Sequence, residues 1–155
     1  MLLFLSGCGW QSVYYRPSAD ETMQTEKIAV LPISEETGRF LRSKLEDLFN
    51  PQKKDVAKKY TLQVVLTERI DSDQGILGDN TATRATMSLT AQIILKQKDK
   101  ILLDTNTFAS SSYNILMLPY PTVTAEDATR HRLLDVLAGQ IATRVSVYFK
   151  NQETK

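Results

Sequence analysis

Apolar and polar residues alternate strictly in the middle of the chain. In the strand candidate at residues 81–96, every second position from Ala85 to Leu95 is apolar, and the positions between carry mostly hydroxyl or amide groups. Such alternation is typical of a strand that has one face in a core and the other near water. The predicted core positions are Ala85, Met87, Leu89, Ala91, Ile93 and Leu95, and the predicted outer positions are Arg84, Thr86, Ser88, Thr90 and Gln92.

Further strands are predicted on both sides of this segment. Residues 60–67 alternate in the same way, and residues 101–112 form a segment rich in Thr and Ser. The charged residues 96–100 suit a turn, so the segments on either side of them are expected to form a long β-hairpin. Residues 71–80, rich in Asp and Gly, predict another turn.

A short apolar run at residues 27–33 predicts one more strand, covered on at least one face. Pro32 has no N–H to donate to a ladder, so it marks an edge or the end of this strand.

The spacing of apolar residues changes to the helical period in two places. The first helix is predicted to follow Ser34 and to stop at Asn50-Pro51. The second is long, begins at a sequence like a capping box at Thr124 and ends near Lys150. The positions at this spacing are Phe40, Leu41, Lys44, Leu45, Leu48 and Phe49 in the first helix, all apolar except Lys44. In the second helix they are Ala128, Leu133, Leu134, Leu137, Ile141, Val145, Tyr148 and Phe149.

The predicted order of elements is therefore β-α-β-β-β-α. One helix on each side of a strand meander implies an α+β fold: a two-layer α/β sandwich whose mostly antiparallel four-stranded sheet carries both helices on one face. The opposite face, rich in Thr, Ser and Arg, is then uncovered and is the predicted docking surface. We expect this single domain over residues 27–150, followed by a polar tail at residues 151–155.

The first residues have the layout of a bacterial lipoprotein signal peptide. An apolar run of five residues leads into Ser6, Gly7 and Cys8, the single cysteine of the chain. A signal peptidase needs small residues before the cut, and the thiol after it is acylated. We therefore predict residues 1–7 as a remnant signal peptide and residues 8–26 as a lipidated tether.

The predicted modification of Cys8 is a diacylglycerol on the thiol plus an acyl chain, such as palmitate, on the amine. More than one buried chain gives a stable membrane anchor. No Lys or Arg precedes Cys8, so the true start of the signal peptide is expected upstream. The alternative is an unmodified Cys8 in a buried strand, which the glycines on both sides of it disfavour.

Composition narrows the possible classes of function. The 155 residues suffice for one sizeable core. Nineteen basic and eighteen acidic residues leave a net charge of +1, which argues against a nucleic-acid partner. A single cysteine allows no intramolecular disulfide. After Leu5 no stretch approaches the roughly 20 apolar residues that a membrane span needs.

Residues that could support catalysis are sparse. His131 is the single histidine, and no cysteine remains to pair with it once Cys8 is acylated. One His and one Cys far apart cannot form a metal site, and no glycine-rich phosphate loop occurs. We expect a protein that is not an enzyme and that has no cofactor other than its covalent lipid.

Two loops are candidates for contacts. Residues 115–121 are strongly apolar yet carry two prolines, so we predict a loop that either contacts a partner or a lipid or folds over its own core. The candidate contact residues are Leu116, Met117, Leu118 and Tyr120. The basic residues 52–59 either contact an anion or headgroup or form an ordinary solvated loop.

The chain resembles the LPS-assembly lipoprotein (LptE) family, most closely its alphaproteobacterial members. The resemblance covers nearly all of residues 5–150 and rests on the order of elements more than on any single motif. The segments that carry it are the Cys-Gly-Trp start, "LRSKLEDLF", "YTLQVVL", "TATRATMSLTAQIIL", "SSYN" and "AEDATRHRLLDVLAGQIATRV".

This resemblance implies a lipoprotein on the periplasmic side of the outer membrane. It would plug the LptD β-barrel, assist the folding of that barrel and contact lipopolysaccharide on its way to the cell surface. Gly9 after the lipidated Cys8 also suits sorting to the outer membrane.

A contact with lipopolysaccharide phosphates should use Arg or Lys. The candidates are Arg84, Lys96, Lys98 and Lys100, for each of which an ordinary solvated charge is the alternative. The alternative function is a lipid-anchored periplasmic adaptor or chaperone, unrelated to lipopolysaccharide, that binds another protein at a sheet edge.

Overall fold

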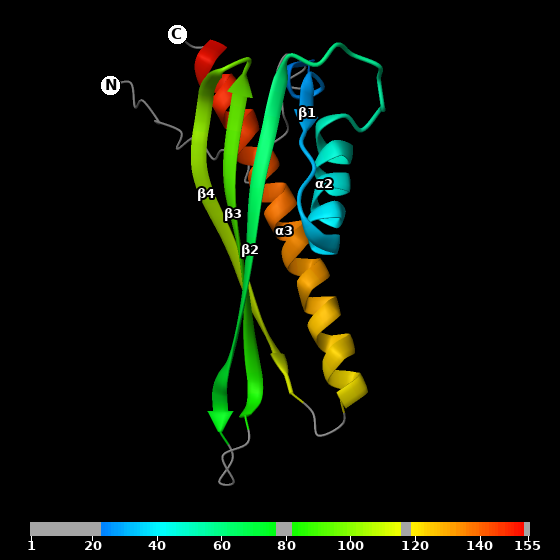
Figure 1. The fold of residues 1–155 in the computed structure, drawn as a ribbon, viewed down its shortest axis with the longest axis vertical. Coiled ribbons are helices and arrows are strands. Elements are labelled where there is room, and N and C mark those ends of the chain that lie inside the picture. The colour runs from blue at the N-terminus through cyan, green and yellow to red at the C-terminus, as the bar shows by residue number, and fades with distance from the viewer. Residues whose placement is uncertain (1–22, 77–81, 116–118, 154–155) are drawn as a thin grey trace, which may run out of the picture.

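The computed structural model describes residues 23–76, 82–115 and 119–153. Their order of elements is the predicted one (Figure 1). The elements are β1 (Ile28–Val30), α2 (Glu35–Phe49), β2 (Tyr60–Ile76), β3 (Ala82–Gln97), β4 (Lys100–Asn114) and α3 (Pro119–Glu153).

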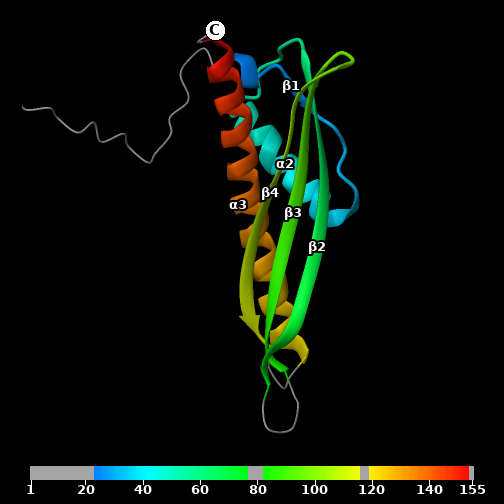
Figure 2. The same cartoon turned by 90° about the vertical axis from the view of Figure 1, so that its left-hand side faces the viewer.

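The four strands form one sheet in the order β1-β2-β3-β4. Strand β1 pairs in parallel with β2, whereas β2 with β3 and β3 with β4 are antiparallel. Helix α3 packs on β3 and β4 and also against α2, so that both helices lie on one face of the sheet (Figure 2). The predicted α+β fold is confirmed.

The core lies between β3 and α3. All six predicted core residues of β3 are buried, and so are the leucine, isoleucine and valine positions predicted for α3. Two positions of the predicted stripes, Leu48 and Ala128, are exposed instead. In α3 the residue after Ala128, Thr129, is buried in its place. The Thr129 hydroxyl donates to the carbonyl of Ala125 at 2.7 Å, so it needs no hydrogen-bond partner outside its own helix.

Strand β2 is longer than the sequence predicted. It continues through Asp71 to Ile76, where a turn was expected. A register shift between Asp71 and Gln74 absorbs the irregular residues, and pairing with β3 resumes at Gln74 and Arg84. A local excess of Asp and Gly therefore marks a bulge here.

Helix α3 begins earlier than predicted. The residues 119–121, predicted as the end of a loop, are helical, and the expected cap at Thr124 lies inside the helix. Prolines at 119 and 121 fit the first turn because the first N–H groups of a helix have no intrahelical acceptor. At its other end the helix runs to Glu153, three residues into the predicted tail.

Residues 24–26, predicted as the end of the tether, are packed against the domain. Thr25 and Glu26 are buried, and Lys54 Nζ lies 2.8 Å from Glu26 Oε1. The Lys58 ammonium donates to the carbonyl of Glu26 at 2.9 Å. The ordered domain therefore begins before the first strand.

Two glycines in helices predict opposite effects of the same substitution. A Cβ on Gly38 would lie 2.7 Å from Ile33 Cγ2 and 2.8 Å from its backbone carbonyl, whereas a Cβ on Gly139 meets nothing within 4 Å. Gly38→Ala should lower the free energy of unfolding by about 1–3 kcal/mol through overpacking. Gly139→Ala should raise it by about 0.5–1 kcal/mol through helix propensity.

Urea denaturation followed by circular dichroism measures both changes. Equal effects of the two substitutions would show that the close approach of α2 to Ile33 is not part of the native packing.

Candidate functional site

The face of the sheet opposite the helices carries the predicted outer residues of β3. Because side chains alternate along a strand, the burial of Leu89 and Ala91 directs Ser88 and Thr90 to the other face. Pairing places Ser88 between Arg69 and Ser110, and Thr90 between Thr67 and Phe108. The middle of this uncovered face is therefore made mostly of hydroxyl groups.

Side chains on this face also contact one another across the strands. The hydroxyls of Thr86 and Ser112 lie 2.9 Å apart, and Gln92 donates to Asp104 at 3.3 Å. Phe108 interrupts the polar surface, since its side chain is 70% exposed. We call the uncovered surface of β2, β3 and β4 the open face.

The predicted lipopolysaccharide contacts do not come together. Arg84 lies on the open face near the start of β3, whereas Lys96 is at the end of that strand and Lys98 and Lys100 lie at the turn into β4. Twelve residues of strand separate Arg84 from Lys96, which corresponds to about 40 Å. The four cations therefore form two separate positions at opposite ends of the hairpin.

The other predicted contacts lie mostly outside the described residues. This applies to Cys8 and to Leu116, Met117 and Leu118. Tyr120 is in the first turn of α3, but its side chain is not among those described.

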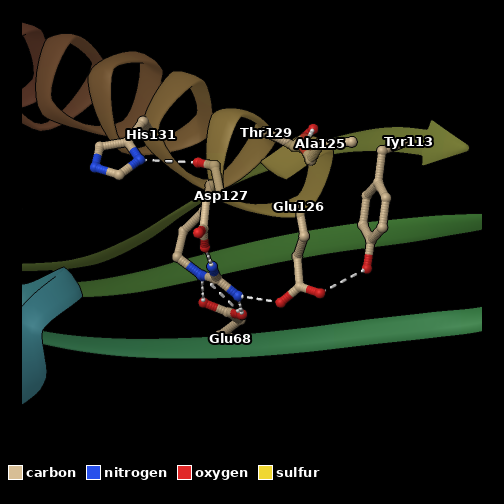
Figure 3. Close-up of polar contacts among 8 residues, drawn as sticks. Glu68, Tyr113, Ala125, Glu126, Asp127, Thr129 and His131 are labelled. Atoms are coloured by element: carbon tan, nitrogen blue, oxygen red, sulfur yellow. Dashed lines mark hydrogen bonds and ion pairs between the residues drawn. The ribbon is translucent and has the colours of Figure 1, made fainter. Parts of the chain in front are cut away.

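A charged cluster, not predicted from the sequence, joins α3 to β2. The guanidinium of Arg130 donates to Glu68 through Nε at 2.9 Å and through Nη2 at 2.8 Å. It also pairs with Asp127 at 2.7 Å and with Glu126. Figure 3 shows these carboxylates converging on one guanidinium, with the Tyr113 hydroxyl donating to Glu126.

Burial and charge act together in this cluster. The side chain of Arg130 is 18% exposed, and its hydrogen bond to Glu68 raises its pKa, against the effect of burial. Burial raises the pKa of Tyr113, and the negative charge of Glu126 raises it further. An arginine that is always charged cannot exchange protons, so this geometry suits a structural tie between sheet and helix.

The sequence contains a local signal for the helical part of this cluster but none for its contact with the sheet. Glu126, Asp127 and Arg130 have the spacing of ion pairs within a helix. Glu68 is 62 residues from Arg130, and no local pattern links the two.

His131 lies one residue farther along α3, on the exposed side. Its Nδ1 is 2.8 Å from the carbonyl of Asp127, and its ring meets Phe40 edge-on at 4.8 Å. Within the described residues no three His, Cys, Asp or Glu side chains are grouped so that they could hold a metal ion. No helix in that part of the chain is long and apolar enough to span a membrane.

Comparison with solved structures identifies the fold. A Caulobacter crescentus protein assigned to the lipoproteins shares 18% identity and a TM-score of 0.66, with 86% of this chain and 98% of that one covered. The minor lipoprotein of Acinetobacter baumannii shares 21% identity and a TM-score of 0.62, with 79% and 92% covered. The rare lipoprotein B of Shewanella oneidensis shares 11% identity and a TM-score of 0.62, with 81% and 98% covered.

No family model and no curated protein matches the sequence. The chain therefore has a fold found in bacterial lipoproteins, as shown by structure at low identity.

The Arg130 cluster predicts a large effect of one substitution. Arg130→Met should lower the free energy of unfolding by roughly 2–4 kcal/mol, because Glu68 and Glu126 lose their cation in a partly buried position. Arg42→Met, which removes an exposed pair with Glu46, should cost about 0.5 kcal/mol or less. Chemical denaturation of both variants measures the two changes in the free energy of unfolding. Similar changes would show that the Arg130 cluster does not stabilise the contact between α3 and β2.

Proposed function

We propose that this protein is an LptE-like outer-membrane lipoprotein that plugs the LptD β-barrel, assists its assembly and helps to deliver lipopolysaccharide to the cell surface. The observation that carries the proposal is the open face. A plug must present polar groups to the inner wall of a barrel, because barrel interiors are polar. The rows around Ser88 and Thr90 supply four hydroxyls, and the one charged side chain in them, Arg69, is paired with Asp71.

The shape of the domain supports the same role. Strands of 15 to 17 residues and a helix of 35 residues make an elongated body (Figure 1). A body of this kind can extend into a lumen from one end while its open face contacts the wall. The fold that it shares with bacterial lipoproteins supports an envelope location.

The anchor in this proposal is Cys8, which carries a diacylglycerol and an acyl chain. Small residues before it and Gly9 after it are the sequence support.

Arg84, near the start of β3 and far from the turn between β3 and β4, is one proposed lipopolysaccharide contact. Its exposed guanidinium can bind a phosphate with two parallel hydrogen bonds. Lys96, Lys98 and Lys100 lie too far away to bind the same phosphate.

The alternative is a lipid-anchored periplasmic adaptor or chaperone. It has one specific observation in its favour: β4 is an edge strand, and Phe108 on it is largely exposed. An edge strand offers unpaired backbone groups to an added strand of a partner.

Purification of the native protein in mild detergent separates the two functions. The plug predicts stoichiometric recovery of a large β-barrel protein, whereas the adaptor predicts a soluble periplasmic partner. Ser88→Trp, in the centre of the open face, should reduce the recovered barrel at least tenfold by steric exclusion. Thr143→Trp, on the exposed side of α3, should leave it unchanged. Equal recovery with both variants would exclude the open face as the docking surface.

Mass spectrometry of the native protein tests the anchor. We expect Cys8 to be the N-terminal residue and to carry both lipid groups, and Cys8→Ser to move the protein from the membrane to the soluble fraction. An unmodified thiol in the membrane-bound protein would disprove the anchor.

A further inference from the structure

We propose that the end of the domain at which the described chain begins binds the headgroups of anionic phospholipids at the membrane surface. The inference deepens the proposed function, since the orientation of this end toward the membrane rests on the anchor at Cys8. The headgroup contact itself is tested without that anchor.

The fold gathers lysines at this end from segments that are distant in sequence. The loop between α2 and β2, the turn between β3 and β4, and the end of α3 all lie there, beside β1 (Figure 1). Lys59 N–H donates to the carbonyl of Lys27 at 2.8 Å, and Thr61 pairs with Lys96. The lysines of this basic end are Lys27, Lys53, Lys54, Lys58, Lys59, Lys96, Lys98, Lys100 and Lys150.

These lysines exceed the carboxylates around them. The acidic residues at the basic end are Glu26, Asp55, Asp99 and Glu153, together with Glu46 and Asp47, which line a hollow with Lys53 and Lys58. Glu26 is already paired with Lys54. The whole chain has a net charge of only +1. The basic end is therefore positive and the remainder of the molecule is negative, a separation that the net charge of the whole chain does not reveal.

The type of cation also differs between the basic end and the rest. Of the lysines that the structure describes, Lys44 alone lies elsewhere, and it pairs with Asp135 at 2.9 Å. By contrast, Arg130 binds Glu68 through two nitrogens, and Arg42 pairs with Glu46 in an exposed position. Flexible lysines, with a compact charge at the end of a long stem, suit a fluid layer of phosphates better than a single defined ligand.

The start of the described chain gives the basic end its orientation. Gln24 accepts a hydrogen bond from Tyr60 at 3.4 Å and, with Lys100, lines a hollow beside the end of α3. The fourteen residues between Cys8 and Met23 can span at most about 50 Å. The described chain begins at the basic end (Figure 1), so the tether attaches an acylated Cys8 to this end of the domain and not to the Arg84 end.

Charge suits the phosphates of phospholipid and of lipopolysaccharide alike, so it is the attachment of the tether at the basic end that favours phospholipid as the occupant. Each lysine close to an anionic membrane strengthens binding by roughly fivefold at low salt. The basic end is also about 40 Å from Arg84 along the hairpin, so one lipopolysaccharide headgroup cannot join the two.

Vesicle sedimentation with the full chain tests this inference. Cys8→Ser removes the acylation site, so that only the surface of the protein can bind. This chain should bind vesicles of phosphatidylcholine with phosphatidylglycerol, should not bind phosphatidylcholine alone, and should be released as salt shortens the Debye length.

A matched pair of triple variants locates the contact. In the Cys8→Ser chain, Lys53→Gln, Lys98→Gln and Lys100→Gln together should weaken binding on the order of 100-fold. Arg39→Gln, Arg69→Gln and Arg84→Gln remove the same charge from other parts of the molecule and should change it less than threefold. Thermal denaturation confirms that both variants are folded before they are compared.

Equal loss in the two triple variants, or equal binding to vesicles with and without phosphatidylglycerol, would overturn the inference. So would failure to bind phosphatidylglycerol vesicles while lipopolysaccharide is bound through the three lysines. The proposed function fails separately, through an unmodified Cys8 or the absence of a barrel partner, because neither measurement uses anionic vesicles.

Discussion

The structure depends on the burial of one face of β3 beneath α3. The six core side chains of β3 are almost completely removed from water, and the stripe of α3 from Leu133 to Val145 covers them. Because a strand alternates, this burial directs the hydroxyls of the same strand outward along the whole hairpin. A slip of one residue would exchange the two faces, so the register is strongly specified. The open face follows directly from the packing of the core.

The length of the hairpin gives the two ends of the molecule different chemistry. Typical strands have about 5–6 residues, whereas β2, β3 and β4 have 15 to 17. Arg84 and the basic end are therefore separated by a distance at which salt screens direct interaction. Midway between them, where α2 no longer covers the sheet, Arg130 and Glu68 join α3 to β2 (Figure 3). The ion pair between Arg130 and Glu68 therefore keeps α3 in contact with the sheet beyond the end of α2.

The same geometry relates the two proposals to each other. The open face presents mostly uncharged hydroxyls, which suits a polar wall, and the basic end presents an excess of lysines, which suits a charged membrane surface. A domain with its lysines at the membrane and its long axis away from it would carry Arg84 farthest from the anchor. The surfaces differ because the wall requires shape and hydrogen bonding, whereas headgroups require only charge.

The sequence by itself determined the elements that a local period encodes. The alternation from Ala85 to Leu95 predicted the core face of β3, and the helical period predicted α2 and most of α3, because the period sets which side chains share a face. Cys8 and its small neighbours could be interpreted in the same local way. For the candidate site, the sequence identified the hydroxyl-rich face.

Only the tertiary structure decided features that join residues far apart in the chain. Pairing with β3 carries β2 past Asp71, where local composition predicted a turn. The partner of Arg130 is Glu68, and the basic end assembles lysines from separate loops and a helix terminus. These contacts form because long-range burial and pairing bring the segments together, and no local pattern records which distant residue a side chain will meet.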